Sequence, residues 1–152
     1  MTPRDRGLTA WRERRYADAR DAARDWIAAE PRSAQAHQLA GQAAARLGDA
    51  ADAARSYETA EALGGGATCA FNAGNAWHAA GDAPKALDAW RRAAAEAVAL
   101  GTHATALAKA LRDAGDMDGA ARVLAKVARA DPNAFDAMQA LVDLAAAAST
   151  SA

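Results

Sequence analysis

Apolar positions along this chain recur with the spacing of an α-helix, and the helical pattern itself recurs at a fixed interval. Gly48, Gly81 and Gly115 follow one another at almost equal steps, and each is followed directly by an aspartate. Alternating runs of β-branched residues are absent, and only 5% of the residues are aromatic, so strands are not expected. A repeat of this length is typical of helical pairs that stack sideways and bury their cores only against their neighbours.

Small and bulky residues keep fixed positions relative to these glycines. A small residue lets two helices approach closely and a bulky residue fills the space beside it, so this alternation is what a repeated helical hairpin requires. The small columns are Gly41, Gly74, Ala108 and Ala53, Ala86, Ala120, and the columns that carry bulky residues are Tyr57, Trp90, Leu124 and Ala44, Trp77, Leu111. We therefore predict that Trp77 and Trp90 lie in the core.

The pattern extends beyond the glycine turns in both directions. Ala19 lies one period before Ala53, and Pro31 lies three periods before Pro132. We predict one domain over residues 1–148, with a partial unit 1–33, clear repeats 34–66, 67–100 and 101–134, and a capping helix 133–148, followed by a flexible tail 149–152. The fold class is all-α, with helices expected at residues 4–13, 16–29, 34–47, 50–62, 67–80, 83–99, 102–114, 117–130 and 133–147. The glycines 64–66 are predicted to end the fourth helix as the most flexible internal joint.

These columns resemble the signature of the tetratricopeptide repeat family over residues 34–132. That signature couples a small residue in the first helix with Gly-Asp or Gly-Asn at the turn, followed by an alanine, a bulky residue and a terminal proline. The matching residues are Gly41, Gly74, Gly48, Gly81, Gly115, Ala53, Ala86, Ala120, Tyr57, Trp90 and Pro132. Gly65 and Val98 depart from it, since the family often has proline there. The resemblance implies a right-handed superhelical α-solenoid whose concave groove, lined mainly by first helices, binds extended peptides or partner helices and carries no chemistry itself.

Side chains on the first helices, on the face opposite the small residues, are the candidate groove residues. The amides of Asn72 and Asn75 offer both a donor and an acceptor, so they either bind an extended backbone or bond to a neighbouring helix. Phe71 stands in a column that is polar in the other units, and we expect it to be exposed as an anchor. The predicted partner-binding residues are Gln38, Gln42, Phe71, Asn72, Asn75, His78, Thr105, Lys109 and Arg112.

Some members of the family grip the C-terminal carboxylate of a partner peptide with lysine, asparagine and arginine side chains from three units. Asn72 matches that pattern, but Gln38 and Gln42 stand at the expected lysine and asparagine positions, and Thr102 and Ala106 replace the expected cations. Because a carboxylate needs charge-assisted donors to be held firmly, such a clamp is not expected in this chain.

The charges of the chain are balanced and interleaved, with Lys+Arg 18 against Asp+Glu 19 and a net charge of −1. Mixing of this kind is typical of a solvated helix surface, so no nucleic-acid partner is predicted. Lys109 and Arg112 either favour an acidic ligand or pair with Asp113 or Asp143. No run approaches the ~20 apolar residues of a membrane helix, and the first residues lack an export signal, so we expect no membrane partner and a cytoplasmic location.

Catalytic and metal-binding patterns are absent from the sequence. His37, His78 and His103 stand one per unit, too far apart for one helix to supply two metal ligands, and Cys69 has no partner cysteine. The glycine-rich segment 64–66 lacks the preceding strand and the Lys-Ser/Thr pair that phosphate binding needs. We therefore predict no enzyme activity, no metal and no cofactor, and a buried apolar role for Cys69.

Three functions remain compatible with these patterns. The leading hypothesis is a non-catalytic adaptor or scaffold that binds a peptide or helix of a partner protein in its groove. The alternatives are a docking or regulatory module of a larger or partner bacterial enzyme, and a scaffold that assembles with itself. In the last case the alanine-rich terminal helix of one copy stacks on the first unit of another, where Trp11 and Trp26 cover the open end.

Overall fold

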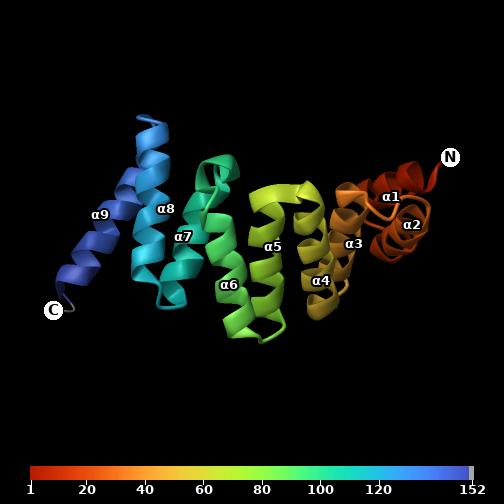
Figure 1. Ribbon diagram of the computed structural model, residues 1–152, viewed down its shortest axis with the longest axis horizontal. Helices are drawn as coiled ribbons and strands as arrows, with labels where there is room; N and C mark the ends of the chain where they lie inside the picture. Colours follow the sequence, from red (N-terminus) through yellow and green to blue (C-terminus); the bar gives the residue numbers. More distant parts are fainter. Residues whose placement is uncertain (151–152) are drawn as a thin grey trace.

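The computed structural model describes residues 1–150. Within this range the chain forms nine α-helices and no strand, as the sequence predicts. They are α1 (Pro3–Arg12), α2 (Tyr16–Ala29), α3 (Ala34–Arg46), α4 (Ala50–Ala60), α5 (Gly66–Ala79), α6 (Ala83–Ala94), α7 (His103–Asp113), α8 (Met117–Ala130) and α9 (Phe135–Thr150). Successive helices lie side by side along one axis, so the two ends of the chain are at opposite ends of an elongated body (Figure 1).

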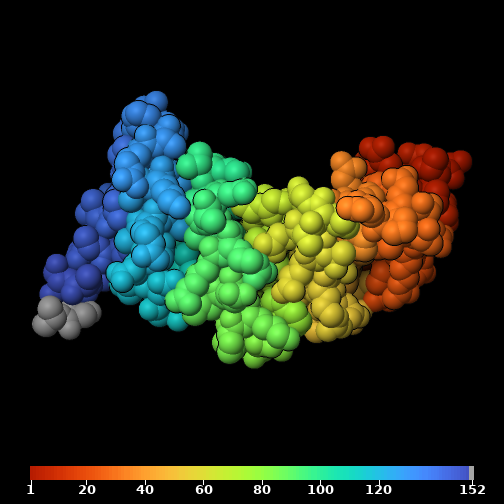
Figure 2. All heavy atoms as spheres, in the orientation of Figure 1, coloured from red at the N-terminus to blue at the C-terminus, as the bar shows by residue number. Residues whose placement is uncertain are grey.

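Each helix packs chiefly on the helix before it and the helix after it in the chain. In the space-filling view the colours follow one another from one end to the other, so neighbouring regions of the visible face belong to consecutive helices (Figure 2). Contacts across one intervening helix, as between α1 and α3 or between α7 and α9, are fewer. This nearest-neighbour packing is that of a solenoid and not of a closed bundle.

Taken in chain order, the helices form four pairs, α1–α2, α3–α4, α5–α6 and α7–α8, which we call the first to the fourth unit, and α9 follows them. The turn inside each of the last three units uses a glycine in the left-handed backbone region, where a Cβ atom causes strain. These glycines are Gly48 with φ 84°, Gly81 with φ 83° and Gly115 with φ 90°. The aspartate after the glycine caps the next helix in two of them, since Asp82 Oδ1 accepts a hydrogen bond from the Lys85 N–H at 3.1 Å and Asp116 Oδ1 accepts one from the Gly119 N–H at 2.9 Å.

The first unit makes the same turn without a glycine. Arg14 lies one period before Gly48 and has φ 58°, the one non-glycine residue with positive φ in the described part of the chain. Gly7 lies one period before Gly41, and both are buried in the interior of their helices. Residues 1–33 therefore contain both helices of a pair, and an arginine takes the position that glycine has in the other three turns.

Aromatic rings pack directly on first-helix glycines in the second and third units. A Cβ atom on Gly74 would lie 2.3 Å from Trp90 Cδ1, and a Cβ atom on Gly41 would lie 3.1 Å from Tyr57 Cδ1. Glycine is thus what allows each ring to lie against the facing helix. Trp77 and Trp90 are both buried, as predicted.

Two joints between helices contain turns that the sequence does not predict. α6 ends at Ala94 instead of residue 99, and a 3₁₀ turn, Ala97–Leu100, leads to Gly101, whose φ of 55° reverses the chain before α7. At the triple glycine the chain forms a π-helical turn, Glu61–Gly65, directly between α4 and α5. Gly64 and Gly66 adopt φ of 97° and 76° there, outside the helical region, so the chain is kinked at Gly64 and the glycines break the helix before α5, as predicted.

The last helix begins later than predicted and runs further. Asp131 Oδ1 accepts a hydrogen bond from the Asn133 N–H at 2.9 Å, which holds residues 131–134 as a loop and delays α9 to Phe135. α9 continues to Thr150, so residues 149 and 150 of the predicted tail are helical, and residues 151 and 152 lie outside the described range.

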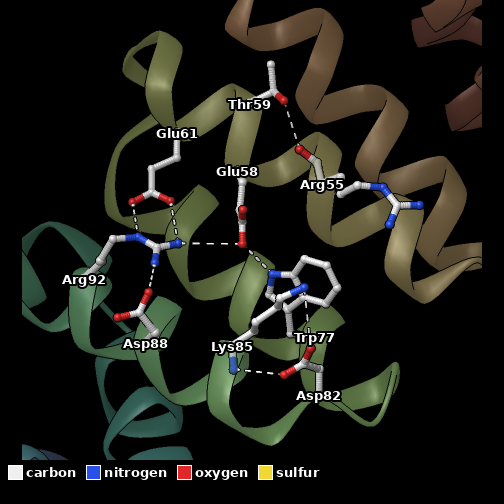
Figure 3. A network of polar contacts seen from close by, with 9 residues as sticks. All are labelled: Arg55, Glu58, Thr59, Glu61, Trp77, Asp82, Lys85, Asp88 and Arg92. Carbon is white, nitrogen blue, oxygen red and sulfur yellow. Dashed lines mark hydrogen bonds and ion pairs between the residues drawn. The ribbon is translucent and has the colours of Figure 1, made fainter.

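A polar network joins the second unit to the third (Figure 3). Arg92 of α6 donates from Nε to Glu61 Oε1 at 2.9 Å, across the two units. Glu58 of α4 accepts a hydrogen bond from the indole N–H of Trp77, and Lys85 Nζ lies 4.3 Å from the centroid of that ring. The Trp77 ring is therefore held by a carboxylate at its edge and by a cation at its face.

Candidate functional site

The predicted binding residues lie on α3, α5 and α7, the first helices of the second, third and fourth units. They do not line one cavity. The first group, Gln38 and Gln42, lines a hollow at the N-terminal end of the stack. The last group, Thr105, Lys109 and Arg112, lines a hollow at the C-terminal end. Between the two hollows, α5 carries the remaining four residues, Phe71, Asn72, Asn75 and His78.

The N-terminal hollow is a depression of about 250 Å³ between α1, α2 and α3. Its apolar lining comes from two leucines and two tryptophans, and its polar lining comes from one arginine and three glutamines. None of the three glutamine amides hydrogen-bonds to any part of residues 1–150. The lining residues are Arg4, Leu8, Trp11, Trp26, Gln35, Gln38, Leu39 and Gln42. This set contains a cation and no carboxylate.

Phe71 is buried, with 7% of its surface exposed, so the expectation of an exposed anchor is wrong. Its ring centroid lies 6.0 Å from that of His103, the first residue of α7, and the two rings are tilted by 34°. The start of the next unit thus covers Phe71. The equivalent residues of α3 and α7, Gln38 and Thr105, are only half-buried. The aligned positions of the repeats describe one unit at a time, so they do not show that a residue of the next unit covers Phe71.

The two asparagines of α5 have different surroundings. Asn75 Oδ1 accepts a hydrogen bond from Trp90 Nε1 at 3.1 Å, so this amide bonds to the neighbouring helix α6, one of the two alternatives for it. The Asn72 side chain is half-buried and makes no hydrogen bond within the described part of the chain. His78 is exposed, with its ring centroid 5.7 Å from that of Trp90. Asn72 is therefore the α5 amide left available to a ligand.

The C-terminal hollow, also about 250 Å³, lies between α7, α8 and α9. Lys109 Nζ lies 3.0 Å from Asp113 Oδ2, and Arg112 Nη2 lies 3.4 Å from Asp113 Oδ1. The Lys109 hydrogen bond, with a smaller contribution from Arg112, lowers the pKa of the Asp113 carboxyl. Pairing with Asp113 is thus the alternative that holds for both cations, while Asp143 accepts from Gln139 Nε2 at 2.9 Å.

A larger depression of about 470 Å³ lies at the same end, where the 3₁₀ turn before α7 faces the start of α9. Of the predicted binding residues only Thr105 lines it. Val98 and Phe135 line it and are 56% and 70% exposed. The loop 131–134 between α8 and α9 forms one side of it, beside the 3₁₀ turn.

Chemistry-bearing groups do not converge elsewhere in residues 1–150. No group of three or more His, Cys, Asp or Glu side chains is placed there to hold a metal ion. Burial raises the pKa of the Cys69 thiol, which disfavours the reactive thiolate. None of the described helices is both long and apolar enough to cross a membrane.

No protein-family model and no curated protein matches this sequence. Solved structures do match its fold. The chain superposes on the MamA protein with a TM-score of 0.68 at 21% identity, over 93% of this chain and 78% of that one. It superposes on TTC0263, a thermophilic TPR protein of Thermus thermophilus, with a TM-score of 0.63 at 18% identity, over 91% and 77% of the two chains. For YrrB, a TPR protein, the TM-score is 0.65 at 19% identity, over 94% and 74%.

The chain has the tetratricopeptide repeat fold. Within this fold α1, α3, α5 and α7 are the first helices of successive repeats, and the two end hollows open between them and their neighbours. The part of the site that the sequence did not predict belongs to the first repeat, which contributes Arg4, Leu8, Trp11 and Trp26. Gly7, one period before Gly41, indicates a first helix of a repeat in this region, but Arg14 stands where the other repeats have the turn glycine.

Proposed function

We propose that this chain is a non-catalytic protein-interaction module that binds a peptide or helix of a partner protein along its first helices. The observation that carries the proposal is a set of half-buried amides without a hydrogen-bond partner in residues 1–150, namely Gln38, Gln42 and Asn72. A carboxamide donates and accepts at once, which is what the backbone of an extended peptide needs. These three side chains lie on two consecutive first helices, α3 and α5.

The structural comparisons support this proposal at the level of the fold. YrrB is described as a TPR protein with an unusual peptide-binding site. The shared fold supports peptide binding by a face of this chain, and the amides of Gln38, Gln42 and Asn72 are the residues with which to test it. Absence of catalysis is part of the proposal, because no hydroxyl or thiol of residues 1–150 hydrogen-bonds to a histidine, and the Thr2–Asp5 pair caps α1.

The test is affinity capture from the native cell extract with the protein as bait. The variant Gln38→Ala/Gln42→Ala/Asn72→Ala removes the available amides, and we expect it to lose the captured partner. Phe71 and Asn75 are left unchanged, because their substitution would disturb packing and the bond to Trp90.

The matched control is Asp52→Ala/Arg55→Ala/Thr59→Ala, which changes three exposed side chains of α4. Asp52 and Arg55 bond to each other, so their joint removal leaves no unpaired charge. The control should retain the partner. Equal capture by both triple variants, each shown by circular dichroism to be folded, would overturn the proposal.

Self-association is a second candidate function, and the C-terminal end of the stack favours it. Phe135 and Val142 of α9 are 70% and 61% exposed, which is unusual for large apolar residues outside an interface. Head-to-tail stacking of α9 on the first unit of another copy would cover them. Light scattering that gives the monomer mass at every concentration would rule this out.

A further inference from the structure

The tryptophan indoles of the chain differ in how their N–H groups are satisfied. Trp77 donates to Glu58, and Trp90 donates to Asn75 Oδ1 at 3.1 Å. Trp26 is 4% exposed, and its Nε1 is buried without any hydrogen-bond partner. Buried donors without a partner are rare in folded proteins and call for an explanation. Trp26 also lines the N-terminal hollow, so its ring reports on what enters there, although its N–H has no surface open to a ligand.

The same end of the stack carries two arginines, Arg4 and Arg46, that form no ion pair within residues 1–150. The Arg4 guanidinium lies 5.8 Å from the centroid of Trp26, and the Arg46 guanidinium lies 5.7 Å from the centroid of Trp11. Neither arginine forms an ion pair or a hydrogen bond with a carboxylate of residues 1–150. The acid nearest to Arg4 in sequence, Asp5, is bonded to Thr2 in the cap of α1.

The C-terminal hollow gives the contrast. Its cations, Lys109 and Arg112, share the Asp113 carboxylate, and Asp143 is also part of its lining. The charges there are balanced within the chain, whereas the N-terminal hollow has a cation and no acid in its lining. A cleft lined by one sign of charge attracts a ligand of the opposite sign.

We propose that the N-terminal hollow binds an acidic, extended segment of a partner protein, an assignment that rests on the proposed function and names its ligand chemistry. A carboxylate of the segment pairs with Arg4, a strong charge-assisted interaction. The amides of Gln38 and Gln42 bond to the backbone of the segment. Leu8 and Leu39 contact an apolar side chain next to the acid.

The ligand is carboxylate-bearing protein for reasons of shape as well as charge. A hollow of about 250 Å³ has room for one or two side chains and not for a larger cofactor. Apolar walls with amides at their margin suit a peptide, in which backbone and side chain alternate. Binding of such a segment should weaken as salt is added, because Arg4 and Arg46 are exposed and screened by ions.

The indole region of a ¹H–¹⁵N spectrum tests the proposal directly, since each of the 4 tryptophans gives one side-chain signal. The probes are two blocked synthetic peptides, one rich in glutamate with a central leucine and its twin with every glutamate replaced by glutamine. We expect the acidic peptide to shift the Trp26 signal and to bind at least about tenfold tighter than its twin. The Trp77 and Trp90 signals should not move.

Two variants locate the effect. Arg4→Gln should weaken binding of the acidic peptide by about tenfold and leave binding of the glutamine twin unchanged. Arg129→Gln is the matched control, because Arg129 is an exposed arginine of α8 without an ion pair and outside both hollows. It should bind both peptides as the native protein does.

Failure of this inference is separable from failure of the proposed function. If the acidic peptide leaves the Trp26 signal unmoved, or if the twin binds equally well, the inference is overturned. Side-chain amide signals of Gln38, Gln42 and Asn72 that still respond to either peptide would then uphold the interaction face with a different preference. If both Arg129→Gln and Arg4→Gln lose the preference for the acidic peptide over its glutamine twin, the preference comes from the net charge of the protein. That result would also overturn the assignment to the hollow.

Discussion

The first and third helical units share one fold and differ in how they treat a buried tryptophan. Trp90 in the third unit and Trp26 in the first are 5% and 4% exposed. Trp90 packs on Gly74 and donates to Asn75, so its ring is fixed by shape and by a hydrogen bond. Trp26 has no partner for its N–H. The N–H of the third-unit tryptophan is therefore satisfied within the chain, and that of the first-unit tryptophan is a buried donor without a partner.

The same contrast extends to backbone and charge. The third unit turns at Gly81, while the first unit turns at Arg14, in the conformation that costs a side-chain-bearing residue more. Third-unit Arg92 is tied to Glu61, whereas first-unit Arg4 has no ion pair. In a solenoid the terminal repeat has one open side, so its residues are free to serve binding where an internal repeat must serve packing.

The largest effect should come from filling the gap beneath the third-unit aromatic ring. In Gly74→Ala the new methyl would lie 2.3 Å from Trp90 Cδ1, so the ring or the helix must move, and we expect a loss of about 3 kcal/mol in the free energy of unfolding. Gly7→Ala is the first-unit counterpart. Its methyl would lie 2.7 Å from Leu39 Cδ2, the mobile end of a side chain, and alanine favours the helix, so the change should stay within about 1 kcal/mol. Urea unfolding followed by circular dichroism measures both, and equal losses would contradict the difference in packing.

Replacing each tryptophan by phenylalanine tests the hydrogen-bond part of the comparison. Trp90→Phe loses ring volume and the bond to Asn75, and it should cost about 2 kcal/mol. Trp26→Phe loses similar volume but also removes an unpaired buried donor, so it should cost at least about 1 kcal/mol less. The free energies of unfolding of the two variants, measured without ligand, test this difference. A Trp26→Phe loss as large as that of Trp90→Phe would mean that the Trp26 N–H is satisfied in solution.

Exchanging the turn residues should move stability in opposite directions. Arg14→Gly relieves the left-handed backbone and should raise the free energy of unfolding by about 0.5 to 1 kcal/mol after the entropy cost of glycine. Gly81→Arg gives the third unit the turn of the first and should lower it by about 1 kcal/mol. A Cβ atom on Gly81 meets nothing within 4 Å, so backbone strain alone is measured there. Midpoints of thermal unfolding that shift in the same direction would contradict the strain argument.

The fold was predictable because its signals are local and repeated. Glycine at the turns and small residues at fixed offsets indicate where the helices turn and pack, so the nine helices and the burial of Trp77 and Trp90 follow from spacing. The end of α6 and the start of α9 do not follow from it, because a 3₁₀ turn and the Asp131–Asn133 hydrogen bond decide them. The first unit was harder to recognise as a full pair, since Arg14 replaces the turn glycine that marks the others.

The candidate site was less predictable because it depends on contacts between units. Phe71 stands where other units have a polar residue, yet His103 from the next unit covers it. Asn75 and Asn72 look equivalent in sequence, and only the position of the Trp90 N–H separates them. The N-terminal hollow requires three helices to converge, which no column of one repeat can indicate.

The smallest expected effect concerns the acid after the turn glycine, which caps a helix in the third and fourth units and is replaced by Arg15 in the first. Asp116 Oδ2 accepts a hydrogen bond from Arg91 Nε at 2.9 Å. This bond, followed by that from the Gly119 N–H, holds the pKa of the carboxyl below its usual 3.8. At neutral pH Asp116→Asn should lower the free energy of unfolding by about 0.5 to 1 kcal/mol, because asparagine still caps the helix but loses the ion pair with an exposed arginine.

The pH dependence of that loss identifies its cause. A carboxyl with a lowered pKa in the folded state stabilises the fold fully above the unfolded value of 3.8, and this contribution disappears as the pH falls through the folded pKa. The gap between the native protein and Asp116→Asn should therefore be constant from neutral pH down to about 4 and should close below it. Urea unfolding at a series of pH values measures the gap. If the gap persists in acid, the loss comes from the geometry of the helix cap and not from charge. The absence of this aspartate from the first unit would then mean a missing cap and not a missing ion pair.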